Sequence, residues 1–440
     1  MQSRGLVLNA AGAIFALGLV YLSFGNLLYG EVAIVVCLGL GLLVLLGPDR
    51  LGLGLMVLGY FLAPQDNWRP SAAAPIAFSD VVMALGFALM APRLLANRIR
   101  LPLLFTVGAF GVIVTTLATS ALAASPSASI SPGIRLIFAS VLLPAVIVLW
   151  GPSTVWVNRL LGAYVVGQVF STIYGLAQGA LLNNRYQGTT THPNFFGMCG
   201  LLSVAACFHL YFTVRREYRW LVVLGGLVAL YSITLSGSRG ALLAAVLIIA
   251  LFPFAERSAL SIWGLIMAAV LAVPGLNWLV SNFPDNPLVS RVFGGEDKSV
   301  GYSDDVRTNA LHQGWDRFLG HPIIGSGYDQ LLETHNIYLQ VAIAIGALGL
   351  GAWLVMVFPF VSVLTTSHPL HRLGYISLAY LAIGMTEPSL WERMTWAPMS
   401  LALLAALPGS HGSDDEPSPA PDASDASDAQ PPRRTLRLEV

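Results

Sequence analysis

The chain has 440 residues, of which 55% are hydrophobic and only 10% are charged. Soluble domains carry about 25% charged residues, so this composition excludes an ordinary soluble protein and predicts one surrounded by lipid. The 23 basic and 23 acidic residues balance to a net charge of zero, which argues against a nucleic-acid partner.

Apolar segments long enough to cross a bilayer follow one another along most of the chain. A spanning helix needs about 20 apolar residues, and the first segment (6–24) lacks a cleavage site, so we expect it to be retained as a helix. Segments bounded by charged residues, Pro or Gly predict helices over residues 6–24, 30–47, 50–63, 77–95, 101–123, 133–150, 155–178, 193–213, 219–235, 239–254, 258–274, 335–363, 373–387 and 391–407. The sequence therefore predicts an all-α, polytopic membrane protein with about 12–14 transmembrane helices.

One long polar interruption divides the apolar segments. It covers about residues 276–334 and separates a transmembrane region (1–275) from C-terminal transmembrane helices (335–408). Residues 409–440 are rich in Pro, Ser and Asp and lack apolar periodicity, which predicts a disordered tail.

The polar interruption contains a helical pattern of its own. Ser303, Asp304 and Asp305 form a helix-start signal, the apolar residues of 306–319 fall on roughly one side, and Gly320 is a stop signal. This pattern predicts an amphipathic helix lying at the membrane surface.

The distribution of arginine predicts the orientation. Basic residues favour short cytoplasmic loops, and alternate loops carry most of the Arg residues, including 98, 100, 215, 216, 219, 257 and 372. We therefore predict that both termini are cytoplasmic and that the 276–334 loop is outside.

Three polar clusters lie at helix ends that this topology places on the outer face. They cover residues 185–194, 236–240 and 334–336. Helix N-termini and glycines favour binding of an anion, because unpaired backbone N–H groups point toward it. The clusters therefore predict a site for a phosphate-bearing substrate.

Arginines in and near these clusters are candidate ligands for a diphosphate. We expect Arg239 and Arg307 to bind it bidentately and Arg185 to assist. Alternatively, Arg239 is an interfacial side chain that reaches lipid head groups, and Arg307 pairs with Asp304 or Asp305.

His335 is the candidate general base. The positive end of a helix disfavours a protonated imidazole, so a neutral His335 able to accept a proton is expected near pH 7. Alternatively, His335 and Asn336 only cap the helix. We expect His192 to cap the next helix, with Pro193 in its first turn, and Asn194 to hydrogen-bond the substrate.

The sequence shows no pattern for a metal ion or a cofactor. The loop carboxylates lack metal-ligand spacing, and the three cysteines (Cys37, Cys199 and Cys207) lie in apolar runs, where we expect them to pack. Glu387, Glu392 and Arg393 flank the last outer turn and are expected to pair with each other.

These motifs resemble the O-antigen ligase and O-antigen polymerase superfamily of bacterial membrane glycosyltransferases. The resemblance covers about residues 185–345 and rests on the order of three motifs: His-Pro-Asn-Phe-Phe-Gly (192–197), Ser-Gly-Ser-Arg-Gly-Ala (236–241), and the run from Arg307 through Gly320-His-Pro and Gly325-Ser-Gly to His335-Asn336.

The resemblance implies a function and partners. It implies a multi-spanning fold in the bacterial inner membrane, a large periplasmic loop, and a glycan donor on undecaprenyl diphosphate. The acceptor would be lipid A–core oligosaccharide for a ligase, or another lipid-linked repeat unit for a polymerase. By motif match, Arg239 and Arg307 would bind the diphosphate and His335 would be the base. The polar clusters add Arg185, Asn194, His192 and Asn336 as candidate substrate-binding residues. We expect an inverting, metal-independent transfer by a monomer among membrane lipids.

Two alternatives remain open at this point. A polymerase of O-antigen or exopolysaccharide repeats would use the same donor chemistry. A transporter of lipid-linked polysaccharide would perform no chemistry, although transporters place substrate groups near the bilayer midplane and often show internal repeats.

Overall fold

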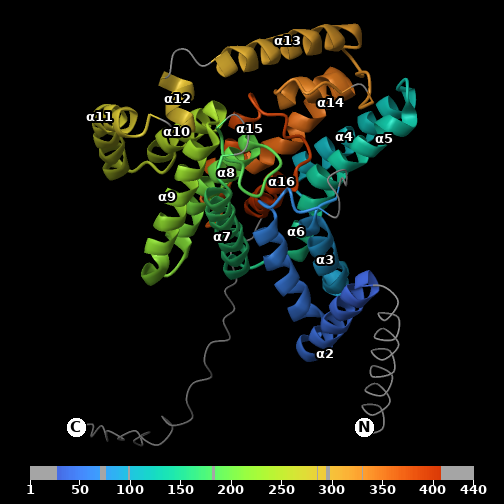
Figure 1. The fold of residues 1–440 in the computed structure, drawn as a ribbon. Coiled ribbons are helices and arrows are strands. Elements are labelled where there is room, and N and C mark those ends of the chain that lie inside the picture. Colours follow the sequence, from blue (N-terminus) through green and yellow to red (C-terminus); the bar gives the residue numbers. More distant parts are fainter. Residues whose placement is uncertain are drawn as a thin grey trace, which may run out of the picture. The chain divides into compact units, whose positions relative to one another are not determined.

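The computed structural model describes residues 27–69, 76–97, 100–180, 184–284, 286–293, 298–329 and 331–407. These residues fold into helices joined by short connections (Figure 1). The expected first helix (6–24) and the expected tail (409–440) lie outside the described residues.

Fifteen α-helices follow one another along the described part of the chain. They are α2 (Leu27–Leu62), α3 (Phe78–Ala96), α4 (Leu103–Leu122), α5 (Pro126–Ile137), α6 (Leu143–Trp150), α7 (Thr154–Gln178), α8 (Pro193–Thr213), α9 (Arg219–Ser236), α10 (Arg239–Ala255), α11 (Ala259–Asn282), α12 (Pro287–Phe293), α13 (Lys298–Gly320), α14 (Ile337–Ser362), α15 (Gly374–Ile383) and α16 (Arg393–Ser400). A π-helical turn (Phe138–Leu142) makes α5 and α6 continuous, and a 3-10 turn (Leu401–Ala406) extends α16.

The predicted fold class is confirmed: the chain is an all-α, multi-pass membrane protein. Within the described residues, eight helical segments are long and apolar enough to cross a membrane, and α10 is a shorter apolar helix. Every predicted apolar segment that the structure describes forms helix. The break expected between 30–47 and 50–63 is a kink in α2, where Gly47 has a φ of 76°.

Several predicted boundaries were wrong. The helix expected over 258–274 continues to Asn282, and the helix expected from 133 begins at Pro126. The helix α13 begins at Lys298, before the expected start signal, although it ends at Gly320 as predicted. Asp304 therefore lies inside the helix, where its carboxylate forms an ion pair with Arg239 of α10.

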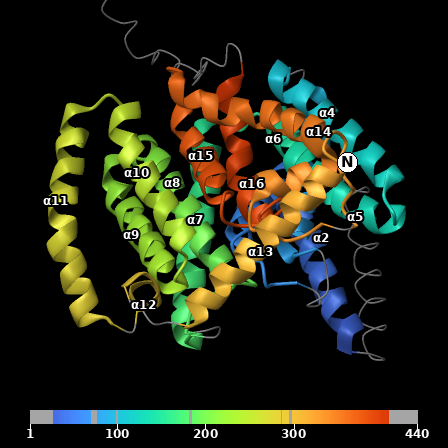
Figure 2. The ribbon, with the colours of Figure 1, turned by 90° about the horizontal axis from the view of Figure 1, so that it is seen from above.

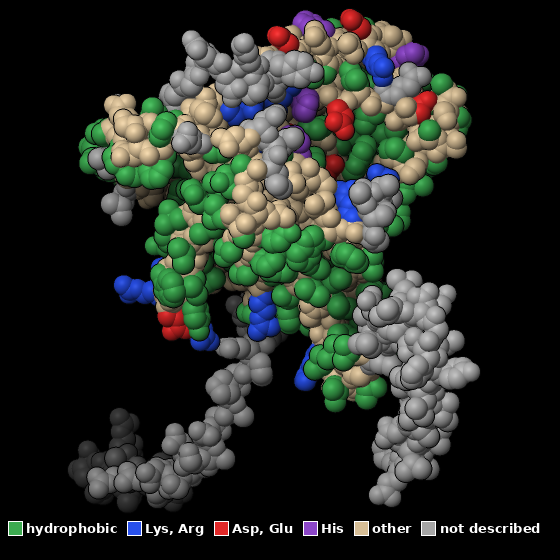
Figure 3. Space-filling view, viewed as in Figure 1, with side chains coloured by type: hydrophobic (Ala, Val, Ile, Leu, Met, Phe, Trp, Pro, Cys, Tyr) green, Lys and Arg blue, Asp and Glu red, His purple; other side chains and the backbone are tan. Residues whose placement is uncertain are grey.

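The helix α8 lies at the centre of the packing. Of the residues in its most apolar stretch, 78% are buried inside the protein. The helix α8 packs against α7, α9, α10 and α15 (Figure 2). The helices α4 and α14 form another large interface, as do α2 and α3. In the space-filling view, a mostly hydrophobic band separates charged side chains at the upper and lower ends of the molecule (Figure 3).

The helix α14 is interrupted in its first half, which the sequence did not predict. At Gly346 the backbone has a φ of 71°, and a Cβ there would lie 2.1 Å from the carbonyl oxygen of Ile323. Beyond the break, the amide of Ala347 donates to the carbonyl of Pro322 at 2.8 Å. Gly325 has a φ of 79° and is equally close to this backbone, with a Cβ position 2.5 Å from the carbonyl oxygen of Ala344. The segment 322–327 therefore crosses α14 at its break, and only glycine fits at both positions.

Candidate active site

The structure brings the three polar clusters together. A Cβ at Gly197 of the first cluster's helix would lie 2.5 Å from Ser236 Oγ of the second. The third cluster lies beside the loop after α15, because the amide of Ile337 donates to the carbonyl of Gly384 at 2.8 Å. A Cβ at Gly240 would lie 2.2 Å from Thr386 Oγ1 in that same loop. Contacts that only small residues allow thus join segments far apart in sequence.

The first cluster forms the start of α8. His192 is the N-cap residue, and its Nδ1 accepts a hydrogen bond from the amide of Asn194 at 3.1 Å, so it caps the helix with Pro193 as first residue, as expected. Asn194 is buried, with 3% of its surface exposed, and its Oδ1 accepts from Arg185 Nη2. Arg185 Nε also donates to the carbonyl of Ser236 at 2.6 Å. Arg185 and Asn194 therefore form a buried support beneath the site.

The second cluster is a tight turn between α9 and α10. Gly237 adopts a left-handed conformation (φ 59°) that ends α9, and Ser238 Oγ accepts from the amide of Ala241 to cap α10. This turn places Arg239 as the first residue of α10, where the positive end of the helix dipole adds to its charge. Arg239 forms its ion pair with Asp304 of α13.

Four arginines gather around this turn, and we call Arg185, Arg239, Arg291 and Arg307 the arginine cluster. Burial, and then the positive charge of Arg291, lowers the pKa of Arg185 to about 10, and Arg307 and Arg239 contribute to the same lowering. Arg291 lies against the turn, since a Cβ at Gly237 would be 3.1 Å from its Cδ. Arginines held this close repel one another, so the cluster favours a bound anion.

Glu387 offsets part of this positive charge. It is 2% exposed, and its Oε1 lies 3.5 Å from Arg307 Nη2. Burial raises the pKa of Glu387 to about 7, although Arg307, a hydrogen bond with Asn194, and Arg185 each lower it. Glu387 is therefore only partly ionised near neutral pH and does not neutralise the cluster. The expected pairing of Glu387 with Arg393 was wrong, as was the alternative pairing of Arg307 with Asp304.

His335 lies beside the arginine cluster, immediately before α14. Its φ of 53° is in the left-handed region, which non-glycine residues seldom adopt outside functional or tightly constrained sites. Asn336 is the N-cap residue of α14, and its Oδ1 accepts from the amide of Leu339 at 3.0 Å. The capping role considered for both residues therefore belongs to Asn336, which leaves the His335 imidazole available.

The His335 imidazole is poised as a neutral base. Burial, and then the charge of Arg307, lowers the pKa of His335 below its ordinary value. Its Nδ1 is buried and has no hydrogen-bond partner among the described residues. Burial, followed by Arg185 and His335, lowers the pKa of His192 to about 4. Both imidazoles are thus neutral at pH 7, because burial and neighbouring arginines lower their pKa values.

A cavity of about 440 Å³ opens beside His335. Its lining joins aromatic, carboxylate and imidazole side chains with Gln340, which is buried in α14. The lining residues are His192, Phe195, Tyr328, Leu331, Glu333, His335, Gln340, Glu387, Pro388, Leu390, Trp391 and Glu392. We call this space the His335 cavity. In the space-filling view, His, basic and acidic side chains lie close together in the upper part of the molecule (Figure 3).

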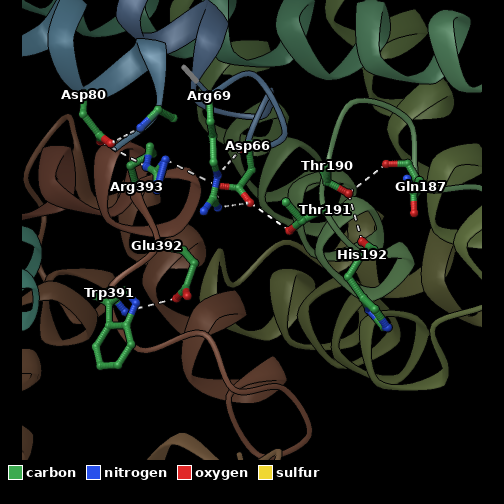
Figure 4. Close-up of polar contacts among 11 residues, drawn as sticks. Asp66, Arg69, Asp80, Gln187, Thr190, Thr191, His192, Trp391, Glu392 and Arg393 are labelled. Carbon is green, nitrogen blue, oxygen red and sulfur yellow. Dashed lines mark hydrogen bonds and ion pairs between the residues drawn. The ribbon is translucent and has the colours of Figure 1, made fainter. Parts of the chain in front are cut away.

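An ion-pair network supports one wall of the cavity (Figure 4). Arg393 Nε contacts Asp80 at 3.0 Å and its Nη1 contacts Asp66 at 3.3 Å. Asp66 is 1% exposed, and its Oδ2 accepts from Thr191 Oγ1 at 2.9 Å. The network therefore joins the end of α2 and the starts of α3 and α16 to the residue before His192.

Sequence reasoning overlooked several residues of this site. Arg291, Gln340 and Trp391 were not predicted as site residues, and Glu387 was expected only as an ion-pair partner. The available signal was an ionisable or amide residue at the end of an apolar helix, where burial is costly and function is common. Trp391 carried no such signal, because a tryptophan there is also an ordinary interfacial residue.

Comparison with known proteins identifies part of the chain. A family model described as O-Antigen ligase matches residues 224–354. The chain carries an O-antigen ligase domain. This confirms the predicted superfamily for the matched domain and supports a membrane enzyme of the O-antigen ligase and polymerase family. A search of curated proteins finds no match.

The O-antigen ligase domain contains much of the site but not all of it. Arg239, Arg291, Arg307 and His335 fall within the matched residues. Arg185 and its partner Asn194 precede the domain, and Glu387 follows it. Helices on both sides of the O-antigen ligase domain therefore complete the arginine cluster and the His335 cavity.

Proposed function

We propose that the chain transfers a glycan from undecaprenyl diphosphate to an acceptor hydroxyl, as an O-antigen ligase. The acceptor would be lipid A–core oligosaccharide or a similar glycolipid. The observation that carries this proposal is the position of a neutral His335 beside a cluster of four arginines, within an O-antigen ligase domain. A base next to an anion site matches a reaction in which a hydroxyl attacks and a diphosphate leaves.

The arginine cluster binds the diphosphate in this proposal. Arg239 and Arg307 are partly exposed, with side chains 32% and 27% accessible, whereas Arg185 is buried and holds Asn194. Arg239 and Arg307 therefore contact the diphosphate oxygens, while Arg185 positions the start of α8 and adds its charge. A bound diphosphate would compete with Asp304 for Arg239 and with Glu387 for Arg307.

The reaction is a single displacement with inversion at the anomeric carbon. The acceptor oxygen forms a bond to that carbon as the bond between the carbon and the diphosphate oxygen breaks. The bonding electron pair leaves with undecaprenyl diphosphate, and the hydroxyl proton moves to His335. Arg239 and Arg307 stabilise the negative charge that develops on the leaving group, where fixed cations contribute most.

The membrane orientation belongs to this proposal as well. Arginine-rich connections at alternate helix ends support cytoplasmic termini and an active site at the periplasmic face of the bacterial inner membrane. The isoprenoid chain of the donor would then lie among the helices, with its diphosphate at the level of α13.

A reconstituted transfer assay tests the proposal. The purified protein in lipid nanodiscs is supplied with a lipid-linked glycan donor and an acceptor, and both glycosylated acceptor and released undecaprenyl diphosphate are measured. The proposal predicts equal amounts of the two products. Movement of intact donor across a vesicle membrane without release of undecaprenyl diphosphate would instead indicate a transporter.

A polymerase would share the same donor site, so the acceptor decides between the two enzymes. A deletion strain that loses all polymer-capped lipopolysaccharide indicates a ligase. A strain that retains lipopolysaccharide capped with a single repeat unit indicates a polymerase.

A further inference from the structure

The His335 cavity differs in charge from the arginine cluster beside it. None of the described residues that line the cavity is Arg or Lys, whereas three are glutamates. Its two histidines, His192 and His335, are neutral at pH 7 because burial and nearby arginines lower both pKa values. Glu387 lies at the boundary, since it lines the cavity and also contacts Arg307. Near His335, the arginines therefore lie outside the cavity lining, whereas carboxylates form part of it.

The lining of the cavity suits a ligand with many hydroxyl groups. Phe195, Tyr328 and Trp391 provide aromatic surface, while Glu333 and Glu392 provide hydrogen-bond acceptors. A volume of about 440 Å³ lies within the usual range of small-molecule sites, which is about 300–1,000 Å³. A lipid tail would bring these carboxylates no hydrogen-bond donor beyond the backbone amide of Trp391, which donates to Glu392 Oε2 at 3.1 Å, and the carboxylates disfavour a diphosphate.

Gln340 provides an independent indication that the cavity binds a hydrogen-bond donor. It is 2% exposed, lines the cavity, and its Oε1 has no hydrogen-bond partner among the described residues. Its Nε2 donates to the carbonyl of Leu332 at 3.4 Å, which holds the amide in place. Leaving a buried acceptor unsatisfied costs about 1–3 kcal/mol, so a donor from a ligand is expected there.

We propose that the His335 cavity is the acceptor subsite and that it selects a sugar without carboxylate or phosphate groups. This inference rests on the proposed transfer reaction. An acceptor sugar stacks on the aromatic side chains and donates hydroxyl hydrogen bonds to Gln340 Oε1 and Glu392. Its reacting hydroxyl then faces His335, on the side opposite the arginine cluster.

Binding of simple sugars tests the subsite without any donor or transfer. The probes are methyl glucoside, methyl glucosaminide and methyl glucuronide, which differ mainly in charge. Saturation-transfer NMR with the protein in nanodiscs should detect the glucoside and the glucosaminide, with the glucuronide signal at least about fivefold weaker because of the carboxylates. Equal signals from all three sugars, or the strongest from the glucuronide, would overturn the proposed selectivity.

Two variants locate the bound sugar. Trp391→Leu and Gln340→Leu should each weaken glucoside binding about tenfold, and the exposed tryptophan of α13 provides the control Trp315→Leu. In the transfer assay, both cavity variants should raise the KM for acceptor and leave the KM for donor unchanged. A change in donor KM alone, or equal loss in Trp315→Leu, would contradict the assignment.

A third variant, Glu333→Gln, should fold normally, because Glu333 is exposed in the loop before His335. It therefore tests the charge of the cavity without the risk of misfolding. This variant should improve glucuronide binding relative to glucoside, and an unchanged ratio in this folded protein counts against the charge argument. If the protein shows no transfer activity but binds sugar in a way that depends on Trp391, the proposed function is refuted and the sugar subsite stands. If transfer is unchanged in Trp391→Leu and Gln340→Leu, the subsite is refuted and the proposed function stands.

Discussion

Arginines form ion pairs near both ends of α10, but the two sets of ion pairs differ. At the C-terminal end, Glu256 accepts from Arg372 Nη2 at 2.5 Å and from Arg372 Nε at 3.0 Å, and lies 3.3 Å from His371 Nε2. Arg372 also covers the ring of Phe212 at 4.0 Å. One carboxylate is thus matched to its cations by short bidentate contacts.

At the N-terminal end of α10, the ion pairs are more exposed or less charged. Arg239 pairs with Asp304, which is 47% exposed, and Arg307 pairs with Glu387, whose pKa burial raises to about 7. The closely matched pair stabilises the structure, whereas arginines gathered beside a neutral imidazole suit an anionic substrate. Four substitutions and one pH series test this contrast between the two ends.

His335→Ala should have the largest effect on activity. Loss of the base should lower the transfer rate about 10²–10⁴-fold while the KM for donor stays nearly constant, because the arginine cluster is intact. Stability should change little, since Nδ1 of His335 makes no protein hydrogen bond within the described structure. Near-normal transfer by a folded His335→Ala protein would refute the base assignment.

Arg239→Ala should lower kcat/KM for the donor about 10²–10³-fold, because it removes a cation from the leaving group. Arg239→Lys should recover part of the loss, since it restores charge but not bidentate geometry. Arg215→Ala is the matched control, as that side chain is 83% exposed and distant in sequence. Steady-state kinetics in nanodiscs at fixed ionic strength measure the difference, and equal activity of Arg239→Ala and Arg215→Ala would rule out the anion site.

Gly346→Ala should unfold the crossing between α14 and the segment 322–327. The new Cβ would meet backbone at 2.1 Å in a left-handed conformation, so we expect a loss of about 1–3 kcal/mol in stability and a displaced His335. Gly351→Ala, in the same helix, meets nothing within 4 Å and should be neutral. Thermal unfolding and transfer activity of the two variants provide the test, and similar behaviour would argue against a structural role for the break.

Arg372→Ala should separate stability from chemistry. It leaves the half-buried Glu256 without its bidentate partner, which should cost about 1–3 kcal/mol. The kcat/KM of the protein that remains folded should match wild type, because this end of α10 takes no part in transfer. A selective fall in kcat/KM without destabilisation would show that the two ends are not independent.

The smallest expected effect is a pH dependence of donor binding. Glu387 gains negative charge as pH rises through its pKa of about 7, and that charge competes with the donor diphosphate for Arg307. The KM for donor should therefore rise a few-fold between about pH 6 and pH 8, and Glu387→Gln should remove the dependence. Because its pKa is lowered, His335 is less protonated over this range than an ordinary imidazole, so kcat should vary less with pH than it would for a base with an ordinary pKa. A kcat that rises steeply above pH 7 would place the base elsewhere.

Much of this architecture follows from the sequence alone. Apolar length located the helices, and Ser-Gly-Ser at 236–238 indicated the turn that places Arg239 at a helix start, because glycine and capping residues act over a few neighbours. The pairing of the charges did not follow in the same way. Asp304 was expected to start a helix or to pair with Arg307, but it pairs with Arg239.

Pairing between distant helices depends on how close the backbones come. Gly240 admits Thr386, and Gly346 admits the segment 322–327, so these glycines determine where Glu387 and His335 lie. Sequence periodicity predicts a continuous helix through Gly346, because an isolated glycine in an apolar run does not by itself indicate a break. The cavity and its acidic lining result from those contacts and could not be predicted without them.

Binding of undecaprenyl diphosphate to the purified protein tests whether the N-terminal end of α10 is the anion site. We expect wild type to bind this lipid, Arg239→Ala to bind it at least about tenfold more weakly, and Arg372→Ala to bind it as wild type does. Unchanged binding by Arg239→Ala, or an equal loss in folded Arg372→Ala, would show that the anion site lies elsewhere.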